Sequence, residues 1–227
     1  MNRVAFLVDG FNLYHSVVKA QEDNGGTCVK WLDLRRLCLS FFDKVGAVVK
    51  DQVEMDGIYY FSAPPNHCPP GTLRRHRFYV RCLRGSGIQV HLGSFKVKMV
   101  TCHLCGKESR HHEEKETDVA IAAKLFELCH SGAAASFVLV TGDTDLVPAV
   151  KVCRKLFPEV SIFCVFPYQR VNDDLRRFSH ASFKLTRENY LTNQYPSPLR
   201  LSDGTMVTRP TEWDPPATPP LASTPTI

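Results

Sequence analysis

The sequence predicts an α/β fold, a Rossmann-like three-layer sandwich with a mainly parallel sheet, on three observations. Short, almost continuously apolar segments alternate along the chain with segments of helical period, which is the pattern of parallel strands covered by helices on both faces. The 227 residues suffice for one substantial core plus an appendage. Hydrophobic residues make up 44% and charged residues 22%, the balance of an ordinary globular protein.

Five short apolar segments are predicted as strands: Val4–Val8, Gly57–Phe61, Ile88–Leu92, Phe137–Thr141 and Val160–Phe166. Four segments with apolar residues at helical spacing are predicted as helices: Trp31–Phe42, Thr72–Arg84, Asp118–His130 and Asp145–Leu156. Right-handed crossovers between parallel strands then give the three-layer sandwich. We expect Phe95–Thr101 to extend the sheet edge as a hairpin.

From Tyr195 the composition changes. Eight of the fifteen prolines lie at or beyond position 196, among serine, threonine and aspartate. Such a segment buries too little apolar surface to offset the entropy that it loses on ordering. We therefore expect one domain over residues 1–194 and a disordered, proline-rich tail over residues 195–227, which is a solvated tail rather than a recognition motif.

Charge and composition restrict the class of protein. The net charge of +5 permits a polyanionic partner without requiring one. No apolar run approaches the roughly 18–20 residues that cross a bilayer, and Asp9 interrupts the first apolar run before a signal peptide could form. Nine cysteines without a secretion signal favour reduced thiols or metal ligation over a disulfide framework. We therefore expect a cytoplasmic protein without a membrane partner.

Acidic residues follow two of the predicted strands and begin one predicted helix. Asp9 follows the first strand, and Asp143 and Asp145 follow the fourth. Asp118 opens the third helix, with Thr117 as its cap. In open α/β sheets the ligand site lies beyond the carboxyl ends of the strands, so we expect the four carboxylates at one edge. Each aspartate taken singly could instead be a helix cap or a turn former.

Four carboxylates at one site repel one another, and a hard Mg²⁺ or Mn²⁺ ion relieves that repulsion. Such an ion can activate water and neutralise the charge that develops on a phosphodiester. Asn12 and Thr141 can support this chemistry by positioning a phosphate oxygen or a metal-bound water. The sequence has no GxSxG, P-loop or GxGxxG motif after a strand. Phe11 stands where an aspartyl-nucleophile phosphatase would need a second aspartate.

Three segments resemble the signature motifs of the NYN domain family, which belongs to the PIN-like group of metal-dependent ribonucleases. The segments are Val8–Leu13, Glu114–Val119 and Thr141–Leu146, and the similarity spans about Met1–Tyr190. The resemblance implies an endoribonuclease that cuts RNA with water activated by Mg²⁺ or Mn²⁺, and it allows a homodimer. It assigns the metal and catalytic roles to Asp9, Asp118, Asp143 and Asp145, with Asn12 and Thr141 in support.

Two alternatives stay open at this point. One is a catalytically silent RNA-binding module whose acidic site is vestigial, because fold and function can separate. The other keeps the nuclease chemistry and takes DNA as the substrate, because a site directed at phosphate does not report the sugar. The full set of aspartates favours the ribonuclease, since a binding module gains nothing from carboxylates that face phosphates.

A cysteine and histidine cluster is predicted as a zinc-knuckle insertion over residues 102–112. Cys102 and Cys105 form a Cys-x2-Cys pair, and His112 is the expected third ligand of a structural Zn²⁺. The fourth ligand is open between His111, the nearest in sequence, and His103, His67 or Cys68. The alternative is a pair of buried thiols with solvated histidines. A zinc knuckle here would have a structural role, because it would fix the orientation in which Asp118 enters the site.

Basic residues recur on one face of the predicted helix Thr72–Arg84 and shortly after the next strand. They are Arg74, Arg77, Arg81, Arg84, Lys96 and Lys98. A row of guanidinium groups can follow a phosphate backbone, and such contacts weaken steeply with salt. We expect these six side chains to contact RNA, although a solvated helix face carries the same pattern.

Overall fold

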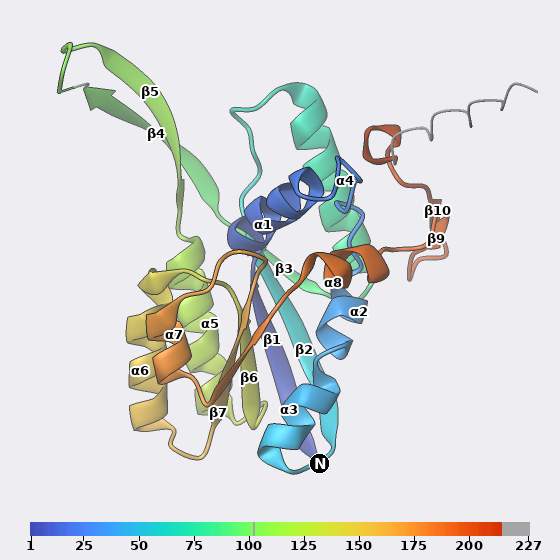
Figure 1. The fold of residues 1–227 in the computed structure, drawn as a ribbon, viewed down its shortest axis with the longest axis vertical. Helices are drawn as coiled ribbons and strands as arrows, with labels where there is room; N and C mark the ends of the chain where they lie inside the picture. Colours follow the sequence, from blue (N-terminus) through green and yellow to red (C-terminus); the bar gives the residue numbers. More distant parts are fainter. Residues whose placement is uncertain (102, 215–227) are drawn as a thin grey trace, which may run out of the picture.

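The computed structural model describes residues 1–101 and 103–214, and its centre is a six-stranded sheet (Figure 1). The strand order is β3-β2-β1-β6-β7-β8, and every neighbouring pair is parallel. The strands are β1 (Asn2–Asp9), β2 (Val53–Ser62), β3 (Gln89–Leu92), β6 (Ser136–Val140), β7 (Ser161–Phe166) and β8 (Ala181–Lys184). The predicted α/β sandwich with a parallel sheet is thus confirmed.

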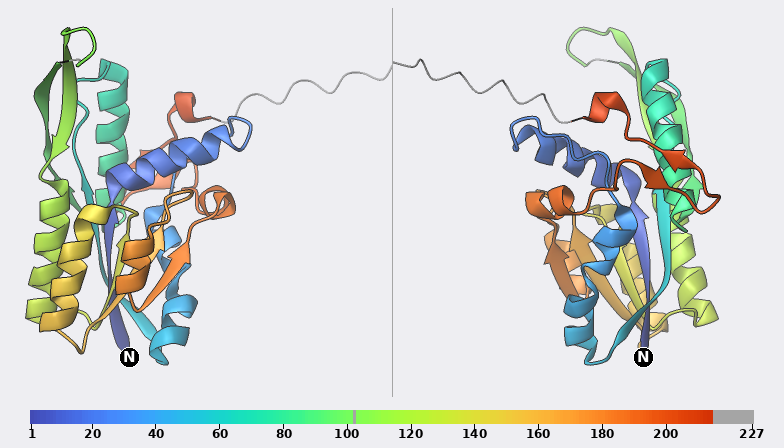
Figure 2. Two further views of the ribbon diagram at one scale, coloured as in Figure 1. Left: turned by 60° about the vertical axis from the view of Figure 1, so that its left-hand side comes forward. Right: turned by 90° about the vertical axis from the view of Figure 1, so that its right-hand side faces the viewer.

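Helices cover both faces of this sheet (Figures 1 and 2). One layer contains α1 (Gly10–Glu22), α2 (Leu34–Leu39), α3 (Phe42–Val49) and α8 (Arg187–Thr192). The other contains α5 (Thr117–Ser131), α6 (Val147–Leu156) and α7 (Asp173–Phe178). In β1, Phe6 packs into the first core and Leu7 into the second. Because both faces of β1 are buried, its sequence is apolar throughout rather than alternating.

Several elements of the structure differ from the predicted ones. The helix predicted over Trp31–Phe42 is two helices, α2 and α3. The Ser40 hydroxyl donates to the Leu37 carbonyl at 2.6 Å, and such bonds compete with helix continuation. Helix α1 has no counterpart among the predicted helices because its buried face includes polar Asn12 and Ser16. Strand β8 has none because it is short and only half-buried.

Strands β4 (Ser94–Thr101) and β5 (Glu108–Lys115) form an antiparallel hairpin that projects from the body (Figure 1). The hairpin exists as predicted, but it is a separate two-stranded sheet and does not extend the central one. The chain turns away at Gly93, whose N–H donates to the Ser62 carbonyl. A Cβ atom at Gly93 would lie 2.7 Å from the Lys115 carbonyl oxygen, so the two strands leave the body at a point where only glycine fits.

The segment from Tyr195 to Asp214 packs against the domain, so the prediction of a disordered tail is wrong for these residues. It contains β9 (Leu199–Arg200), β10 (Met206–Val207) and the 3₁₀ turn η2 (Thr211–Trp213). The Tyr195 and Trp213 rings lie 5.4 and 6.1 Å from the buried Trp31 ring. Apolar residues between the prolines of this segment form a third hydrophobic core together with Trp31. The proline-rich composition does not predict this core. The remainder of the predicted tail, residues 215–227, lies outside the described residues.

In the described part of the chain, no helix combines the length and the hydropathy that crossing a bilayer requires.

Candidate metal centre

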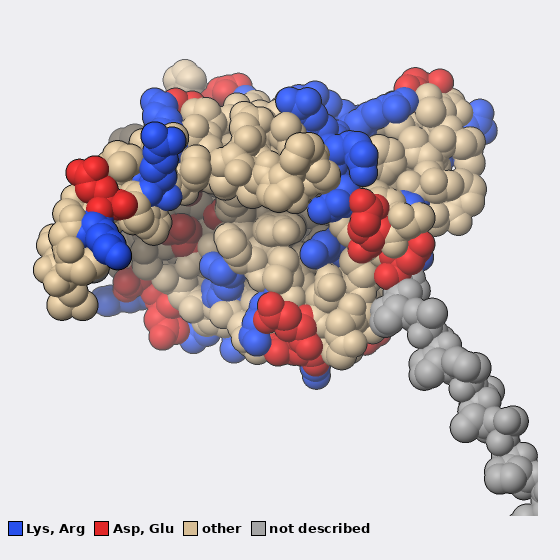
Figure 3. Space-filling model, turned by 90° about the horizontal axis from the view of Figure 1, so that it is seen from above, with Lys and Arg blue, Asp and Glu red and all other residues tan. Residues whose placement is uncertain are grey.

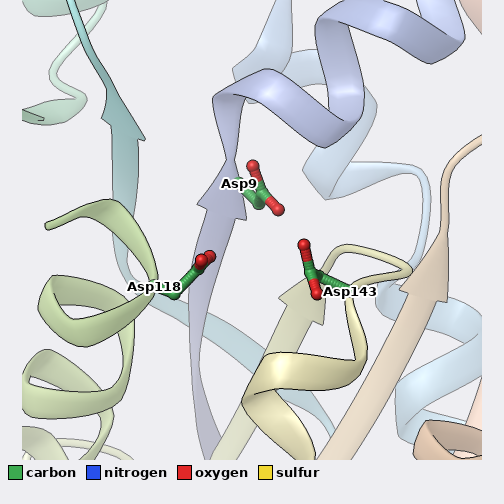
Figure 4. A group of neighbouring side chains, drawn as sticks. All are labelled: Asp9, Asp118 and Asp143. Carbon is green, nitrogen blue, oxygen red and sulfur yellow. The ribbon is translucent and has the colours of Figure 1, made fainter. Parts of the chain in front are cut away.

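Three aspartates from distant parts of the chain converge beyond the carboxyl ends of the central strands (Figure 4). Asp9 ends β1, Asp118 lies in the first turn of α5, and Asp143 follows β6. One carboxylate oxygen from each lies within 4.8 Å of the others. The structure therefore brings together three of the four aspartates that the sequence places at this edge.

The Asp9 carboxylate is buried and hydrogen-bonded at both oxygens. The Asn12 N–H donates to Oδ1 at 2.9 Å, and the Thr141 hydroxyl donates to Oδ2 at 2.8 Å. The same hydroxyl oxygen accepts from the Asp143 N–H at 3.1 Å, and the Asn12 side-chain oxygen accepts from the Gly142 N–H at 3.0 Å. Asn12 and Thr141 thus fix the carboxylates and the loop that carries them, which is a positioning role.

Burial and neighbouring negative charge oppose the ionisation of two of the three carboxylates. Burial raises the pKa of Asp9, although the hydrogen bonds from Asn12 and Thr141 oppose this effect. Burial, then the charges of Asp143 and Asp9, raise the pKa of Asp118 to about 6. Carboxylates whose ionisation is opposed by their neighbours are the ones that a nearby cation stabilises most.

The donor atoms fit a hard divalent cation. All three side chains offer carboxylate oxygens, which are the ligands that Mg²⁺ and Mn²⁺ prefer. No histidine or cysteine belongs to this group within the described residues. The set therefore suits an ion of the magnesium type better than zinc or copper.

Asp145 does not belong to the group, contrary to the prediction. It lies in the 3₁₀ turn η1 (Thr144–Leu146) with its side chain exposed. Its N–H donates to Asp143 Oδ1 at 3.0 Å, so Asp143 caps this turn and directs Asp145 outward. The Asp145 charge still acts at a distance, because it is one of the weaker causes of the raised pKa of Asp118.

Glu114 is a site residue that the sequence reasoning did not assign. Its carboxylate accepts hydrogen bonds from the Thr117 N–H, at 3.1 Å, and from the Thr117 hydroxyl. Thr117, predicted as a cap, is therefore the donor, and it is the first residue of α5. The Glu114 charge also raises the pKa of Asp118. Its place in the motif segment Glu114–Val119 is the signal that could have identified it.

A cavity of about 730 Å³ opens beside the three aspartates. From above, acidic side chains lie in a hollow of the surface with lysine and arginine side chains around it (Figure 3). Besides the carboxylates, the lining includes the rings of Phe11, Phe95, His67, His112 and Trp213 and the cations Lys30 and Arg75. The three aspartates, which could hold a divalent ion, thus line an open cavity with a partly aromatic wall.

The predicted basic stripe lies on α4 (Pro70–Gly85), and its four arginines are not among the described residues that line this cavity, although Arg74 lies 3.7 Å from the lining residue Glu212. Arg74, Arg77, Arg81 and Arg84 are all exposed, whereas the α4 arginine among the described lining residues is Arg75. Asp203 and Glu212 of the C-terminal segment lie beside the helix, because Arg81 is 3.8 Å from Asp203 and Arg75 is 3.0 Å from Glu212. Part of the stripe is therefore paired within the chain.

The two predicted lysines lie on the hairpin, where each has an acidic neighbour. Lys96 Nζ is 3.9 Å from Glu116 and Lys98 Nζ is 3.3 Å from Glu113. All four side chains are largely exposed. Exposed pairs of this kind contribute about 0–1 kcal/mol, so both lysines stay available to a polyanion.

Of the predicted zinc-knuckle insertion over residues 102–112, residues 103–112 form the tip and the beginning of the second strand of the hairpin. Cys105 lies in the turn at its tip, whereas His111 and His112 lie in β5. Adjacent strand residues point to opposite faces, and His112 is four residues beyond the start of β5, about 13 Å at 3.3 Å per residue. Zinc ligands lie about 2.0–2.3 Å from their ion. Among the described residues, His67 and His112 of the predicted set lie side by side, but no three of these side chains come close enough to share an ion, and Cys102 lies outside the described residues.

An α/β sandwich whose strand ends gather carboxylates in this way can hold a divalent cation at that edge of its sheet. Residues 3–185 match the NYN domain family. The chain therefore belongs to the NYN domain family, a family of nucleases, as the resemblance of the three motif segments implies.

Two individual proteins provide further comparison. The chain is 27% identical to the 6-hydroxy-3-succinoylpyridine 3-monooxygenase HspA of Pseudomonas putida, over 78% of this chain and 65% of that protein. A crystal structure of a protein of unknown function from Vibrio parahaemolyticus is similar with a TM-score of 0.51 and 18% identity, over 82% of this chain and 93% of that one. The second likeness shows the fold alone.

Proposed function

We propose that the protein is an endoribonuclease that depends on Mg²⁺ or Mn²⁺ and hydrolyses RNA phosphodiester bonds. The observation that carries the proposal is the convergence of Asp9, Asp118 and Asp143, whose oxygens lie within 4.8 Å of one another. Membership of a nuclease family supports it. The open groove beside the aspartates supports internal cleavage, because a strand can lie along it without presenting an end.

In this mechanism Asp9, Asp118 and Asp143 hold the metal, which supplies an activated water and charge neutralisation at the phosphate when it is bound. Asp9 is held in one orientation by Asn12 and Thr141. Thr141 also ties Asp143 to Asp9 through the Asp143 N–H. Asp118, with its pKa of about 6, releases its proton near neutral pH and becomes available as a ligand.

The test is cleavage of a circular single-stranded RNA, which has no ends and so reports endonuclease activity. We expect cleavage with Mg²⁺ or Mn²⁺, none in EDTA, and a loss of at least about 100-fold in Asp9→Asn and in Asp143→Asn. Asp174→Asn removes an exposed carboxylate from α7 and should leave the rate unchanged. Undiminished cleavage by both site variants would contradict the proposal.

The same assay separates the alternatives. A catalytically silent RNA-binding module would retain salt-sensitive RNA binding in EDTA and cleave nothing. A circular single-stranded DNA of the same sequence distinguishes the two nucleic acids, and we expect it to be the poorer substrate.

The activity after which the Pseudomonas putida relative is named gives a second candidate, a monooxygenase that acts on a pyridine. The donor set argues against an iron oxygenase of the kind that uses two histidines and one carboxylate, because carboxylates alone meet in the described site. Oxygen consumption with 6-hydroxy-3-succinoylpyridine and a nicotinamide reductant, at a rate that exceeds RNA cleavage, would favour this second candidate.

A further inference from the structure

Four aromatic rings form a continuous group in the wall of the cavity that holds the metal centre. Phe11 comes from α1, His67 from the loop between β2 and α4, Phe95 from β4 and His112 from β5. We propose that this group, the aromatic platform, stacks a base of a single-stranded RNA next to the phosphate at the metal centre. The inference rests on the proposed function and adds how the substrate is recognised.

The rings contact one another across three segments of the chain. The Phe95 ring is 5.3 Å from the Phe11 ring and 4.4 Å from the His67 ring, both in edge-to-face arrangement. His67 and His112 stack with centroids 4.3 Å apart and planes 10° from parallel. Edge-to-face and offset-stacked arrangements are the ones that aromatic pairs prefer. These ring contacts hold the hairpin base, the loop and α1 in one arrangement.

The rings are nevertheless not a closed core. Phe11 and Phe95 are half-buried, whereas His67 and His112 are exposed. Flat aromatic surface therefore remains in contact with solvent inside a cavity. Such surface is what a planar ligand covers, because every base has a π-face and stacking tolerates any sequence.

The platform begins directly beside the metal centre. Phe11 is two residues after Asp9, and Phe95 pairs in register with Glu114, whose charge raises the pKa of Asp118. A strand whose phosphate lies at the aspartates therefore has the platform within about one nucleotide. The bases of a duplex are stacked on each other and cannot reach such rings, so the platform selects single strands.

The hairpin continues the same apolar surface outward. Side chains alternate along a strand, so Val97 and Met99 share the face of Phe95. They are 59% and 51% exposed, which is high for side chains of this type and leaves a second apolar contact for the next base. Lys96 and Lys98 lie on the opposite face of the strand, where they can attract the phosphate backbone.

The experiment measures RNA binding apart from cleavage. Fluorescence anisotropy gives the Kd of labelled oligouridylate for the Asp143→Asn variant, with and without a second change, Phe95→Leu or Phe95→Tyr. Phe95→Leu keeps an apolar side chain but removes the ring, and we expect Kd to rise about 10-fold. Phe95→Tyr keeps the ring and should change Kd less than twofold.

A matched ligand identifies the base as the contact. The same measurement uses an oligomer of equal length that carries abasic residues throughout. If the ring stacks on a base, Phe95→Leu should have no further effect on the Kd of this abasic strand, as in a double-mutant cycle. An equal loss with both ligands would overturn the inference, because the ring would then act only on the backbone or on the fold.

Controls separate binding from folding. His67 is exposed on a loop, so His67→Ala should weaken binding and His67→Phe restore it without any change in melting temperature. Phe157→Leu alters a half-buried ring at the far end of α6 and should leave Kd unchanged. Wild-type affinity in both Phe95→Leu and His67→Ala would overturn the inference.

A failure of the aromatic platform can be distinguished from a failure of the proposed nuclease activity. Metal-dependent cleavage with ring-independent binding would keep the nuclease and remove the platform. Ring-dependent binding without any cleavage would keep the platform and leave the protein as an RNA-binding module. Absence of both binding and cleavage would overturn both.

Discussion

The metal centre and the hairpin β4–β5 are neighbours, but different interactions hold them. At the metal centre, the buried Asp9 accepts hydrogen bonds from Asn12 and Thr141. On the hairpin, exposed side chains form ion pairs such as Lys98–Glu113. Buried polar networks are costly to disturb, whereas exposed ion pairs contribute little. The molecule thus separates a fixed site for chemistry from an arm that can adapt to a ligand.

The largest effect is expected from a substitution at Gly142, in the loop that carries Asp143. A Cβ atom there would overlap the backbone carbonyl of Arg170, which cannot move aside as a side chain can. We expect Gly142→Ala to lower the free energy of unfolding by about 3 kcal/mol or more, measured by urea denaturation. Gly71→Ala, whose nearest neighbour is the flexible end of Arg75, is the control and should lie within about 0.5 kcal/mol of wild type.

A milder change removes one hydrogen bond from Asp9. Thr141→Val keeps the side-chain shape but leaves Oδ2 of Asp9 and the Asp143 N–H without this partner. Loss of such support costs about 10- to 100-fold in metal affinity or activity, and calorimetry with Mn²⁺ measures it. Thr144→Val, on an exposed residue of the next turn, should have no effect. Equal affinity in both variants would show that Asp9 needs no orientation.

The pH dependence of stability tests the charge at the metal centre. The pKa of Asp118 is raised to about 6 in the folded protein, so the folded state resists its ionisation. The contribution of Asp118 to the stability of the metal-free protein is therefore fully present below about pH 4, the ordinary carboxyl pKa, and is lost as pH rises through 6. Because solvent screens a partly exposed group, we expect a fall of about 1 kcal/mol.

The measurement compares unfolding of wild type and Asp118→Asn between pH 4 and pH 7 without divalent ions. The variant cannot ionise at this position, so the difference between the two curves isolates Asp118. We expect the variant to become the more stable of the two as pH rises, and Mn²⁺ affinity of the wild type to increase over the same range. Parallel curves would contradict the raised pKa.

The smallest effect on stability is expected at the hairpin. Lys96 and Glu113 lie opposite each other, so an Asn-Gly turn can replace residues 97–112 between them. We expect the melting temperature to change by only a few degrees, because the hairpin buries little of the core. RNA affinity should fall about 10-fold, because the replacement removes the outer half of the platform. A collapse of the fold would show that the arm is structural.

The sequence predicts the sheet well because parallel strands buried on both faces are almost wholly apolar, as in Val4–Val8. It also places Asp9, Asp118 and Asp143, because strand ends of a parallel sheet meet at one edge. The sequence does not predict the position of a residue that depends on contacts between distant segments of the chain. Asp145 lies in the turn η1 with its side chain exposed. Tyr195 and Trp213, from a proline-rich segment, pack against Trp31.

The aromatic platform shows a second limit of sequence patterns. His67 and His112 have the composition of metal ligands, but spacing along the chain does not report which strand face a residue occupies. His112 lies on the same face of β5 as Glu114, and the antiparallel register places Glu114 opposite Phe95 and His112 opposite Val97. His112 thereby joins the rings beside the acidic site, and this placement depends on a pairing that no local pattern encodes.

The match to the NYN family ends at residue 185, yet Glu212 and Trp213 line the cavity. A fragment cut at the shared boundary would therefore lack one side of the groove and would expose Trp31. The family match thus covers the sheet and its three aspartates, whereas the segment Tyr195–Asp214 lies beyond the match and still shapes the cavity beside them.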